Sequence, residues 1–203
     1  GGGNTMSPTV NQPGTYTLMI TNTSTGCTSS DAVVVTSDFA VPTAQILPPS
    51  VLTCFNPTIQ LDGSNSSTGA NFQYTWSTVT GGQITGPNNQ ITATASAVGT
   101  YRLVVRNGDN GCTAQAQVTV SSNMAHPVAE AGPAGTITCQ NPTATLNGAG
   151  SSTGAIYTYQ WSTSSGEIES GANTLTPVVN LPGIYTLVVT NTQNGCTSQD
   201  AAN

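Results

Sequence analysis

The stretch "VGTYRLVVRNGDNGC", residues 98–112, alternates apolar and polar side chains and then turns at an Asn-Gly pair. Tyr101, Leu103 and Val105 occupy every second position, the period of a half-buried β-strand. The stretch occurs twice more, as "PGTYTLMITNTSTGC" at 13–27 and as "PGIYTLVVTNTQNGC" at 182–196. The chain therefore contains one strand-and-turn unit three times.

The repeats have a period of about 85 residues. Cys27 and Cys112 are 85 positions apart, and so are Cys54 and Cys139. This period exceeds the roughly 20–50 residues of solenoid repeats and suits a small domain with its own core. The chain then divides into the closing half of a repeat, a complete repeat, and a third repeat that ends inside its last strand, at residues 1–38, 39–122 and 123–203.

The rest of each repeat also predicts β-structure. Phe72, Tyr74 and Trp76 alternate in "NFQYTWS", no helical stretch is convincing, and the turns are rich in Asn, Gly, Ser and Pro. About seven short strands per repeat, with one Trp near the middle, predict an all-β chain of tandem immunoglobulin-like β-sandwiches. A Gly-x-Tyr sequence opening the penultimate strand predicts a tyrosine corner. The expected core aromatic residues are Trp76, Trp161, Tyr16, Tyr101 and Tyr185.

The turns carry a further expectation. Asn110-Gly111 and Asn194-Gly195 suit the positive φ angles of a tight hairpin. We therefore expect a tight hairpin at each pair.

The charge balance excludes two classes of partner. The chain has two basic residues, both Arg, against eight acidic ones, for a formal net charge of −6. A phosphate backbone is bound through Lys and Arg, so nucleic acid is not an expected partner. Anionic membrane surfaces also attract basic clusters, and no stretch approaches the roughly 18 apolar residues of a membrane span.

Five motifs carry a resemblance: "TCxNPT", "SSTGA", "YxWST", "GxYxLxV" and "NGCT". Through them the whole chain resembles the tandem immunoglobulin-like, PKD-like repeats of very large surface adhesins in the Bacteroidota. The resemblance implies export by the type IX secretion system and a location outside the cell or on its surface. PKD domains continue after the Trp as Trp-Asp-Phe-Gly-Asp-Gly, whereas this chain has "WSTVTGG" and "WSTSSGE". No site tied to that signature is expected.

The five cysteines predict disulfides. The simplest interpretation is one bond per repeat, Cys54–Cys112 and Cys139–Cys196, with the partner of Cys27 outside these 203 residues. The alternative pairs Cys27 with Cys54 and Cys112 with Cys139, across the joints. Disulfides would place the protein outside the cytoplasm.

One geometric objection applies to the simplest pairing. The two cysteines of a repeat should lie at opposite ends of an ordinary sandwich, whereas a disulfide needs Cα atoms within about 7 Å. Either the first strand of the repeat runs differently, or the bonds link neighbouring repeats or chains.

The sequence offers no catalytic site, and we predict that the chain is not an enzyme. His126, the only histidine, corresponds to Val41 one repeat earlier, and we interpret it as part of a solvated linker. The acidic residues are scattered and form no pair facing one cleft. The serines of "GSNSST" lack a general base.

No cofactor is expected, and calcium is the one alternative that we considered. Asp38 and Asp62 would be its ligands at a joint between domains. In the next repeat Asn123 and Asn147 replace them, and no Asp-x-Asp cluster occurs. The favoured interpretation is solvated turn residues and no metal site.

The repetition predicts a long structural chain rather than a catalytic one. We expect a structural or adhesive segment of an extracellular filament or adhesin stalk, whose partners are copies of itself, surface glycans or other cells. Two alternatives stay open, a multivalent carbohydrate-binding array and the spacer domains of a secreted multidomain enzyme. Arg102 and Arg106, on one outward strand face, would be the candidates for binding a carboxylate or an acidic sugar.

Overall fold

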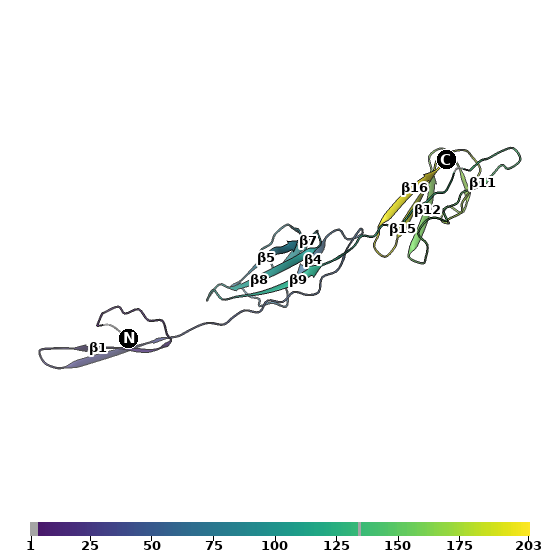
Figure 1. Cartoon of the computed structure of the whole chain (residues 1–203). Coiled ribbons are helices and arrows are strands. Elements are labelled where there is room, and N and C mark those ends of the chain that lie inside the picture. Colours follow the sequence, from purple (N-terminus) through teal and green to yellow (C-terminus); the bar gives the residue numbers. More distant parts are fainter. Residues whose placement is uncertain (1–3, 134) are drawn as a thin grey trace.

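The computed structural model describes residues 4–133 and 135–203. The predicted membership of residues 1–3 in the first repeat lies outside this range. Three β-structured units follow one another in an elongated row, with the β1–β2 hairpin at one end and the unit that contains β16 at the other (Figure 1). The described residues contain no helix with the length and hydropathy of a membrane span.

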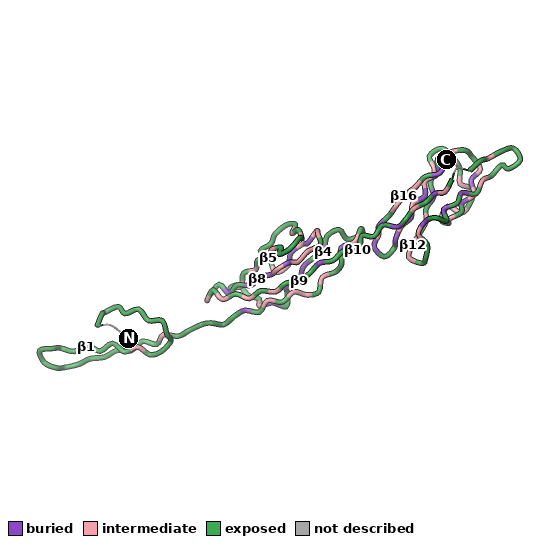
Figure 2. Tube along the Cα trace, in the orientation of Figure 1, coloured by how far each residue is buried: buried purple, intermediate pink, exposed green. Residues whose placement is uncertain are grey.

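The first unit is a single antiparallel hairpin. Strands β1 (Gly14–Thr21) and β2 (Thr28–Val35) pair with each other alone. No second sheet covers them among the described residues, and most of the hairpin is exposed (Figure 2). Leu18, for example, is 50% exposed. The expectation that Tyr16 lies in a core is wrong, because this half-sandwich has no core and the side chain is only half-buried.

The second unit is a complete sandwich. One sheet has the order β4-β7-β6 and the other β5-β8-β9, and all of these pairs are antiparallel. The strands are β3 (Leu52–Thr53), β4 (Ile59–Asp62), β5 (Phe72–Gly81), β6 (Ile84–Thr85), β7 (Thr92–Ala95), β8 (Gly99–Asn107) and β9 (Thr113–Val120). Inward side chains of both sheets form one core, as the alternation predicted; its members include Leu52, Leu61, Trp76, Tyr101, Leu103 and Val105.

The third unit repeats this architecture. Its sheets are β11-β14-β13 and β12-β15-β16. The strands are β11 (Ala144–Thr145), β12 (Tyr157–Thr163), β13 (Ile168–Ser170), β14 (Val178–Val179), β15 (Tyr185–Asn191) and β16 (Thr197–Ala202). Its core is separate from that of the second unit and includes Leu146, Trp161, Val179, Tyr185, Leu187 and Val189. The chain is thus all-β, with immunoglobulin-like sandwiches in tandem.

The predicted aromatic anchors of both sandwiches are confirmed. Trp76 and Trp161 are each 1% exposed, and their indole N–H groups donate to backbone carbonyls at 3.0 and 2.9 Å. The hydroxyl of Tyr101 donates to the carbonyl of Ala97, four residues upstream, at 2.6 Å. Tyr185 makes the equivalent bond, so each sandwich has the predicted tyrosine corner.

Two buried serines hold the segment that opens each sandwich. Ser66 Oγ accepts from the backbone N–H of Gln45 at 2.9 Å and donates to the carbonyl of the same residue at 3.0 Å. Ser151 holds Glu130 in the same way. The "SST" serines therefore fasten the first segment of each sandwich to its body.

The turns differ in detail from the prediction. Gly111 and Gly195 have φ values of 76° and 75°, but no described residue other than glycine has a positive φ. Asn110 and Asn194 therefore do not take the left-handed conformation. Each hairpin loop is longer than expected, because it contains the four residues before each cysteine. The Asn side chains in these loops are therefore free to make other contacts.

Candidate functional site

A disulfide joins the second sandwich to the third. Cys54 is bonded to Cys196, 142 positions later, with their Cα atoms 5.0 Å apart. The predicted bonds Cys54–Cys112 and Cys139–Cys196 are therefore wrong, and so is the alternative that paired Cys27 with Cys54 and Cys112 with Cys139.

The reason is that the two cysteines of one sandwich lie at its opposite ends, as expected from the sequence. The loop carrying Cys54 lies at the end of its sandwich that faces the third unit. The hairpin carrying Cys112 lies at the other end, where Asn110 contacts the linker from the first unit. The two cysteines of one sandwich cannot meet, so a loop cysteine bonds to the hairpin cysteine of the next repeat.

The other cysteines form no bond within the described residues. Cys27 and Cys139 are exposed and Cys112 is half-buried. A partner for Cys27 outside these 203 residues stays a prediction.

Phe55 strengthens the contact around the disulfide. Its backbone N–H donates to the carbonyl of Asn194 at 3.1 Å. Its ring covers Gly195 so closely that a Cβ atom at this position would overlap the ring carbons. Glycine is thus required at this position twice, by its positive φ and by the ring.

Asn194 fastens the linker to the hairpin. The side chain is fully buried, and its Nδ2 donates to Asn123 Oδ1 at 3.1 Å and to the carbonyl of Ala125 at 3.0 Å. Its Oδ1 accepts from the backbone N–H of Cys196 at 2.9 Å. The side-chain amide of Asn194 therefore links the hairpin that carries Cys196 to the linker before the third sandwich, and both its oxygen and its nitrogen have hydrogen-bond partners.

Asn110 makes the matching hydrogen bonds at the first joint, between the first and second units, and we call this set of bonds the asparagine clamp. Asn110 Nδ2 donates to Asp38 Oδ1 and to the carbonyl of Ala40, both at 3.0 Å, and its Oδ1 accepts from Cys112 N–H at 2.9 Å. The pKa of Asp38 is lowered, first by the backbone N–H of Ala40 and then by the Asn110 amide, because both stabilise the ionised carboxylate.

Sequence reasoning missed these two asparagines. The available signal was their fixed position before Gly-Cys, together with an Asp or Asn at the matching linker position. The first hairpin has Thr25 in place of the Asn.

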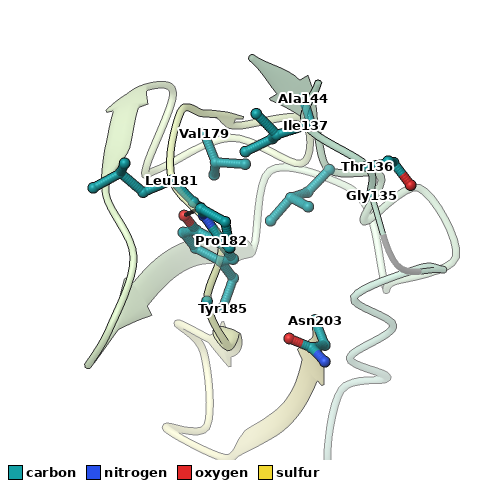
Figure 3. A pocket seen from close by; sticks show the side chains of 11 residues that line it. Gly135, Thr136, Ile137, Ala144, Val179, Leu181, Pro182, Tyr185 and Asn203 are labelled. Atoms are coloured by element: carbon teal, nitrogen blue, oxygen red, sulfur yellow. Dashed lines mark hydrogen bonds between the residues drawn. The ribbon is translucent and has the colours of Figure 1, made fainter. Parts of the chain in front are cut away.

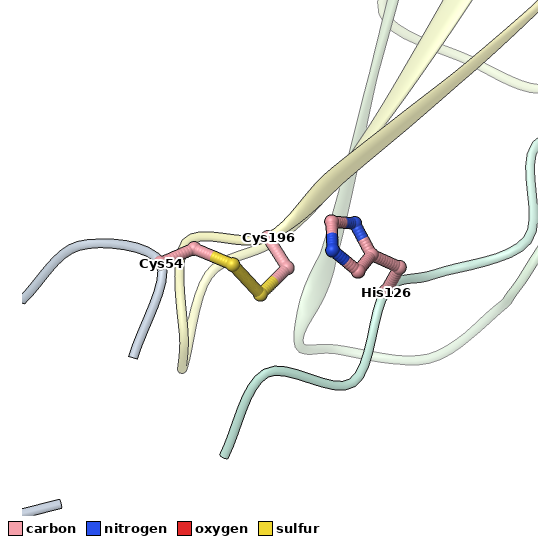
Figure 4. A group of neighbouring side chains, drawn as sticks. All are labelled: Cys54, His126 and Cys196. Carbon is pink, nitrogen blue, oxygen red and sulfur yellow. A yellow bond between two sulfur atoms is a disulfide. The ribbon is translucent and has the colours of Figure 1, made fainter. Parts of the chain in front are cut away.

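His126 lies beside the disulfide (Figure 4). It is exposed, as expected of a linker residue, and its Nδ1 is 2.9 Å from the carbonyl of Thr197. The ligand atoms of His126, Cys54 and Cys196 fall within 4.8 Å of one another. Because the two sulfur atoms are bonded to each other, neither is the thiolate that a metal ion requires.

The two aspartates considered for calcium have different roles. Asp38 belongs to the first joint, whereas Asp62 Oδ1 accepts from the N–H of Ser64 at 2.8 Å in a turn after β4. Neither belongs to a cluster of three metal-ligating side chains in the described part of the chain. Each carboxylate accepts hydrogen bonds from other groups of the protein.

Arg102 and Arg106 lie on β8 next to polar residues of β5. Arg102 Nε donates to Ser77 Oγ at 3.4 Å, and Arg106 donates to Gln73 Oε1 at 3.2 Å. The structure therefore places both side chains over the neighbouring strand. Their binding of a carboxylate stays a prediction.

A cavity of about 390 Å³ opens at the far end of the third sandwich (Figure 3). Apolar side chains line most of it, among them Ile137, Leu146 and Val179. In the second sandwich Leu52 occupies the position of Ile137, and Val120 closes the core beside it. The cavity therefore corresponds to a part of the core that is filled in the second unit.

No family model matches the sequence, and no curated protein matches it. Among solved structures, the titin domains Z1Z2 in complex with telethonin are 11% identical, over 81% of this chain and 96% of that chain, with a TM-score of 0.27. A chimeric titin Z1Z2 carrying a decorin peptide is 12% identical, over 81% and 96%, with a TM-score of 0.30. Domains 4–9 of the surface layer protein SbsC are 14% identical, over 97% of this chain and 36% of that chain, with a TM-score of 0.22.

Proposed function

We propose that the chain is a structural segment of an extracellular filament or cell-surface stalk, and not an enzyme. The observation that carries this proposal is the Cys54–Cys196 bond, which joins two separate sandwiches through the ends that face each other. Neither cysteine belongs to the core cluster of its sandwich, and the bond connects one sandwich to the other. Its effect is to hold neighbouring units in a row.

The contacts around the bond support the same role. At both joints an asparagine amide holds the linker by two hydrogen bonds. Pro42 and Pro127 follow the linkers and are buried, which restricts the backbone where each sandwich begins. Each joint is therefore restrained by its asparagine and its proline, and the second joint also by the disulfide, so that neither is a free hinge.

The surface also suits a long, exposed polymer. Outward strand positions carry mainly Thr, Ser and Gln, and charged residues make up 5% of the chain. Trypsin-like proteases cleave after Lys and Arg, and both Arg residues lie within the paired strand β8. The disulfide supports a location outside the reducing cytoplasm.

Electron microscopy of the purified chain, with and without a reducing agent, tests the proposal. We expect rods of three units whose second joint becomes more variable in angle after reduction. The first joint has no disulfide in the described residues and serves as the internal control. Compact particles, or equal variation at both joints before reduction, would contradict the proposal.

A further inference from the structure

The second joint brings one histidine and two cysteines together from three separate parts of the chain. Cys54 belongs to a loop of the second sandwich, His126 to the linker, and Cys196 to the closing hairpin of the third sandwich. Their metal-ligating atoms all lie within 4.8 Å of one another, and Figure 4 shows the imidazole ring beside the two sulfur atoms. Among the described residues, no other group of three His, Cys, Asp or Glu side chains meets in this way.

The imidazole of His126 has the tautomer that a metal ligand needs. Its Nδ1 is 2.9 Å from the carbonyl oxygen of Thr197, which can only accept a hydrogen bond. Nδ1 therefore carries the proton of the neutral ring, and the free lone pair is on Nε2. Histidines that bind metal ions almost always donate their other ring N–H to a carbonyl or a carboxylate, which fixes the tautomer and the orientation of the ring.

Contacts other than the disulfide also hold the three segments together. Phe55, the residue after the loop cysteine, donates its backbone N–H to the carbonyl of Asn194 at 3.1 Å. The side chain of Asn194 donates to Asn123 and to the carbonyl of Ala125, the residue before the histidine. None of these bonds involves a sulfur atom, so breaking the S–S bond leaves their donors and acceptors in place. The three ligands therefore stay near one another, which lowers the entropy cost of binding an ion.

We propose that, when the disulfide is reduced, Cys54, Cys196 and His126 bind one Zn²⁺ ion, which then links the two sandwiches in place of the S–S bond. Thiolate and imidazole donors suit Zn²⁺, whereas Ca²⁺ and Mg²⁺ prefer oxygen. Two thiolates also balance the charge of the ion. A water molecule takes the fourth position, as at zinc sites with three protein ligands. The inference adds a metal site to the chain and does not depend on the proposed structural function.

The site requires little movement of the joint. Zinc lies about 2.3 Å from a thiolate sulfur and about 2.1 Å from an imidazole nitrogen, so that ligand atoms around one ion are roughly 3.5–3.8 Å apart. The three ligand atoms are already within 4.8 Å of one another. The two sulfur atoms have to separate, and rotation about their Cα–Cβ bonds achieves this with the Cα atoms still 5.0 Å apart. The backbone of the joint therefore does not have to open.

The disulfide is exchanged for zinc in two balanced steps, with a phosphine as the reductant. The phosphine attacks one sulfur atom and breaks the S–S bond, and water then converts it into a phosphine oxide and supplies the protons of two thiols. The phosphine loses two electrons, which the disulfide gains. Each thiol then releases one proton as its sulfur binds Zn²⁺, whereas His126 binds through its neutral Nε2 and releases none.

The test uses the 203-residue chain with Cys27→Ser, Cys112→Ser and Cys139→Ser, so that the only thiols come from the reduced disulfide. Intact mass and Trp fluorescence of the oxidised chain first establish that the bond has formed and that the cores are folded. The chain is then reduced with a phosphine at about pH 8, where imidazole is neutral, and titrated with Zn²⁺ against a chromophoric chelator. We expect one Zn²⁺ per chain. The oxidised chain is the control and should bind none.

His126→Val is the matched variant, because Val41 is the residue at the corresponding position of the first joint. Loss of a hydrogen-bond partner of a zinc ligand typically costs about 10–100-fold in affinity, so loss of the ligand itself should weaken Zn²⁺ binding by about 100-fold or more. In its oxidised form the variant should keep the disulfide and the Trp fluorescence of the parent chain. A weaker affinity then reports the missing imidazole and not a misfolded joint.

Three results would overturn the inference. They are a reduced chain that binds no Zn²⁺, an equal affinity in the His126→Val variant, and one ion shared by two chains in native mass spectrometry. Each of them leaves the proposed structural function standing, because that function depends on the oxidised joint. Compact particles in electron microscopy of the oxidised chain would instead remove the proposed function and leave the zinc site standing.

Discussion

Cys54 and Cys196 are 142 positions apart in the sequence, and their Cα atoms are 5.0 Å apart in the structure. Almost the whole of two sandwiches lies between them along the chain. The bond connects the loop after β3 of the second sandwich to the hairpin loop before β16 of the third, and it helps to hold the two domains together.

Replacing either bonded cysteine should destabilise the chain. Closing a loop of this length contributes at most about 5 kcal/mol by chain-entropy arithmetic. We expect Cys54→Ser and Cys196→Ser to lower the denaturation midpoint by the same amount, and the double variant to be no worse than either one. Chemical denaturation followed by Trp fluorescence measures this. Cys112→Ser is the control, and an equal loss there would contradict the assignment of the bond.

Replacing the buried clamp residue should loosen the second joint. Asn194→Ala leaves Asn123 Oδ1, the Ala125 carbonyl and Cys196 N–H without their partner, at a cost of about 1–3 kcal/mol. Hydrogen exchange should speed up at the Cys196 amide and the adjoining residues. Thr25, at the matching position of the first hairpin, bonds to Cys27 N–H and to no linker among the described residues, so Thr25→Ala should leave the exchange at Cys196 unchanged.

The tyrosine corners should contribute unequally. Tyr101→Phe and Tyr185→Phe remove buried hydroxyl bonds and should each cost about 1–2 kcal/mol, seen in the unfolding of the sandwich concerned. Tyr16→Phe removes the same type of bond, to the carbonyl of Gln12 at 2.7 Å, from an uncovered hairpin. It should have little effect on either transition, and equal costs at all three sites would contradict the role of burial.

The asparagine contact of the first joint should respond to acid, because its partner Asp38 is a carboxylate, whereas the matching partner at the second joint is the amide of Asn123. The pKa of Asp38 is lowered in the folded chain, so its contribution is present above its ordinary value of 3.8 and is lost as the pH falls through the folded pKa. We expect no change between about pH 5 and pH 8, and a looser joint in stronger acid. The NMR signal of the Asn110 side-chain amide reports this. Asp38→Asn copies the Asn123 joint, so an unchanged titration in that variant would contradict the mechanism.

The sequence predicted the sandwiches well because their cores depend on local alternation. Tyr101, Leu103 and Val105 point inward because every second residue of a strand does so. The tyrosine corner was predictable for the same reason, since its hydroxyl bonds only four residues upstream. Tyr16 shows the limit, because burial also requires a second sheet, which the pattern of one hairpin does not reveal.

The joint could not be predicted to the same degree. Cysteine spacing gives the period, but it does not say which end of a sandwich each cysteine occupies. Asn110 and Asn194 were interpreted as turn residues, since Asn-Gly pairs favour positive φ. Their clamping role depends on linkers that arrive from about 70 residues away, beyond the range of local patterns.

The Cys54–Cys196 bond has a consequence for a molecule pulled at its two ends. Tension reaching Cys54 passes through the sulfur atoms directly to Cys196, so residues 55–195 carry almost none of the load. The bond withholds a contour length of roughly 480 Å, at about 3.4 Å per residue, from any extension. A stretched chain therefore keeps most of both sandwiches folded for as long as the disulfide remains intact.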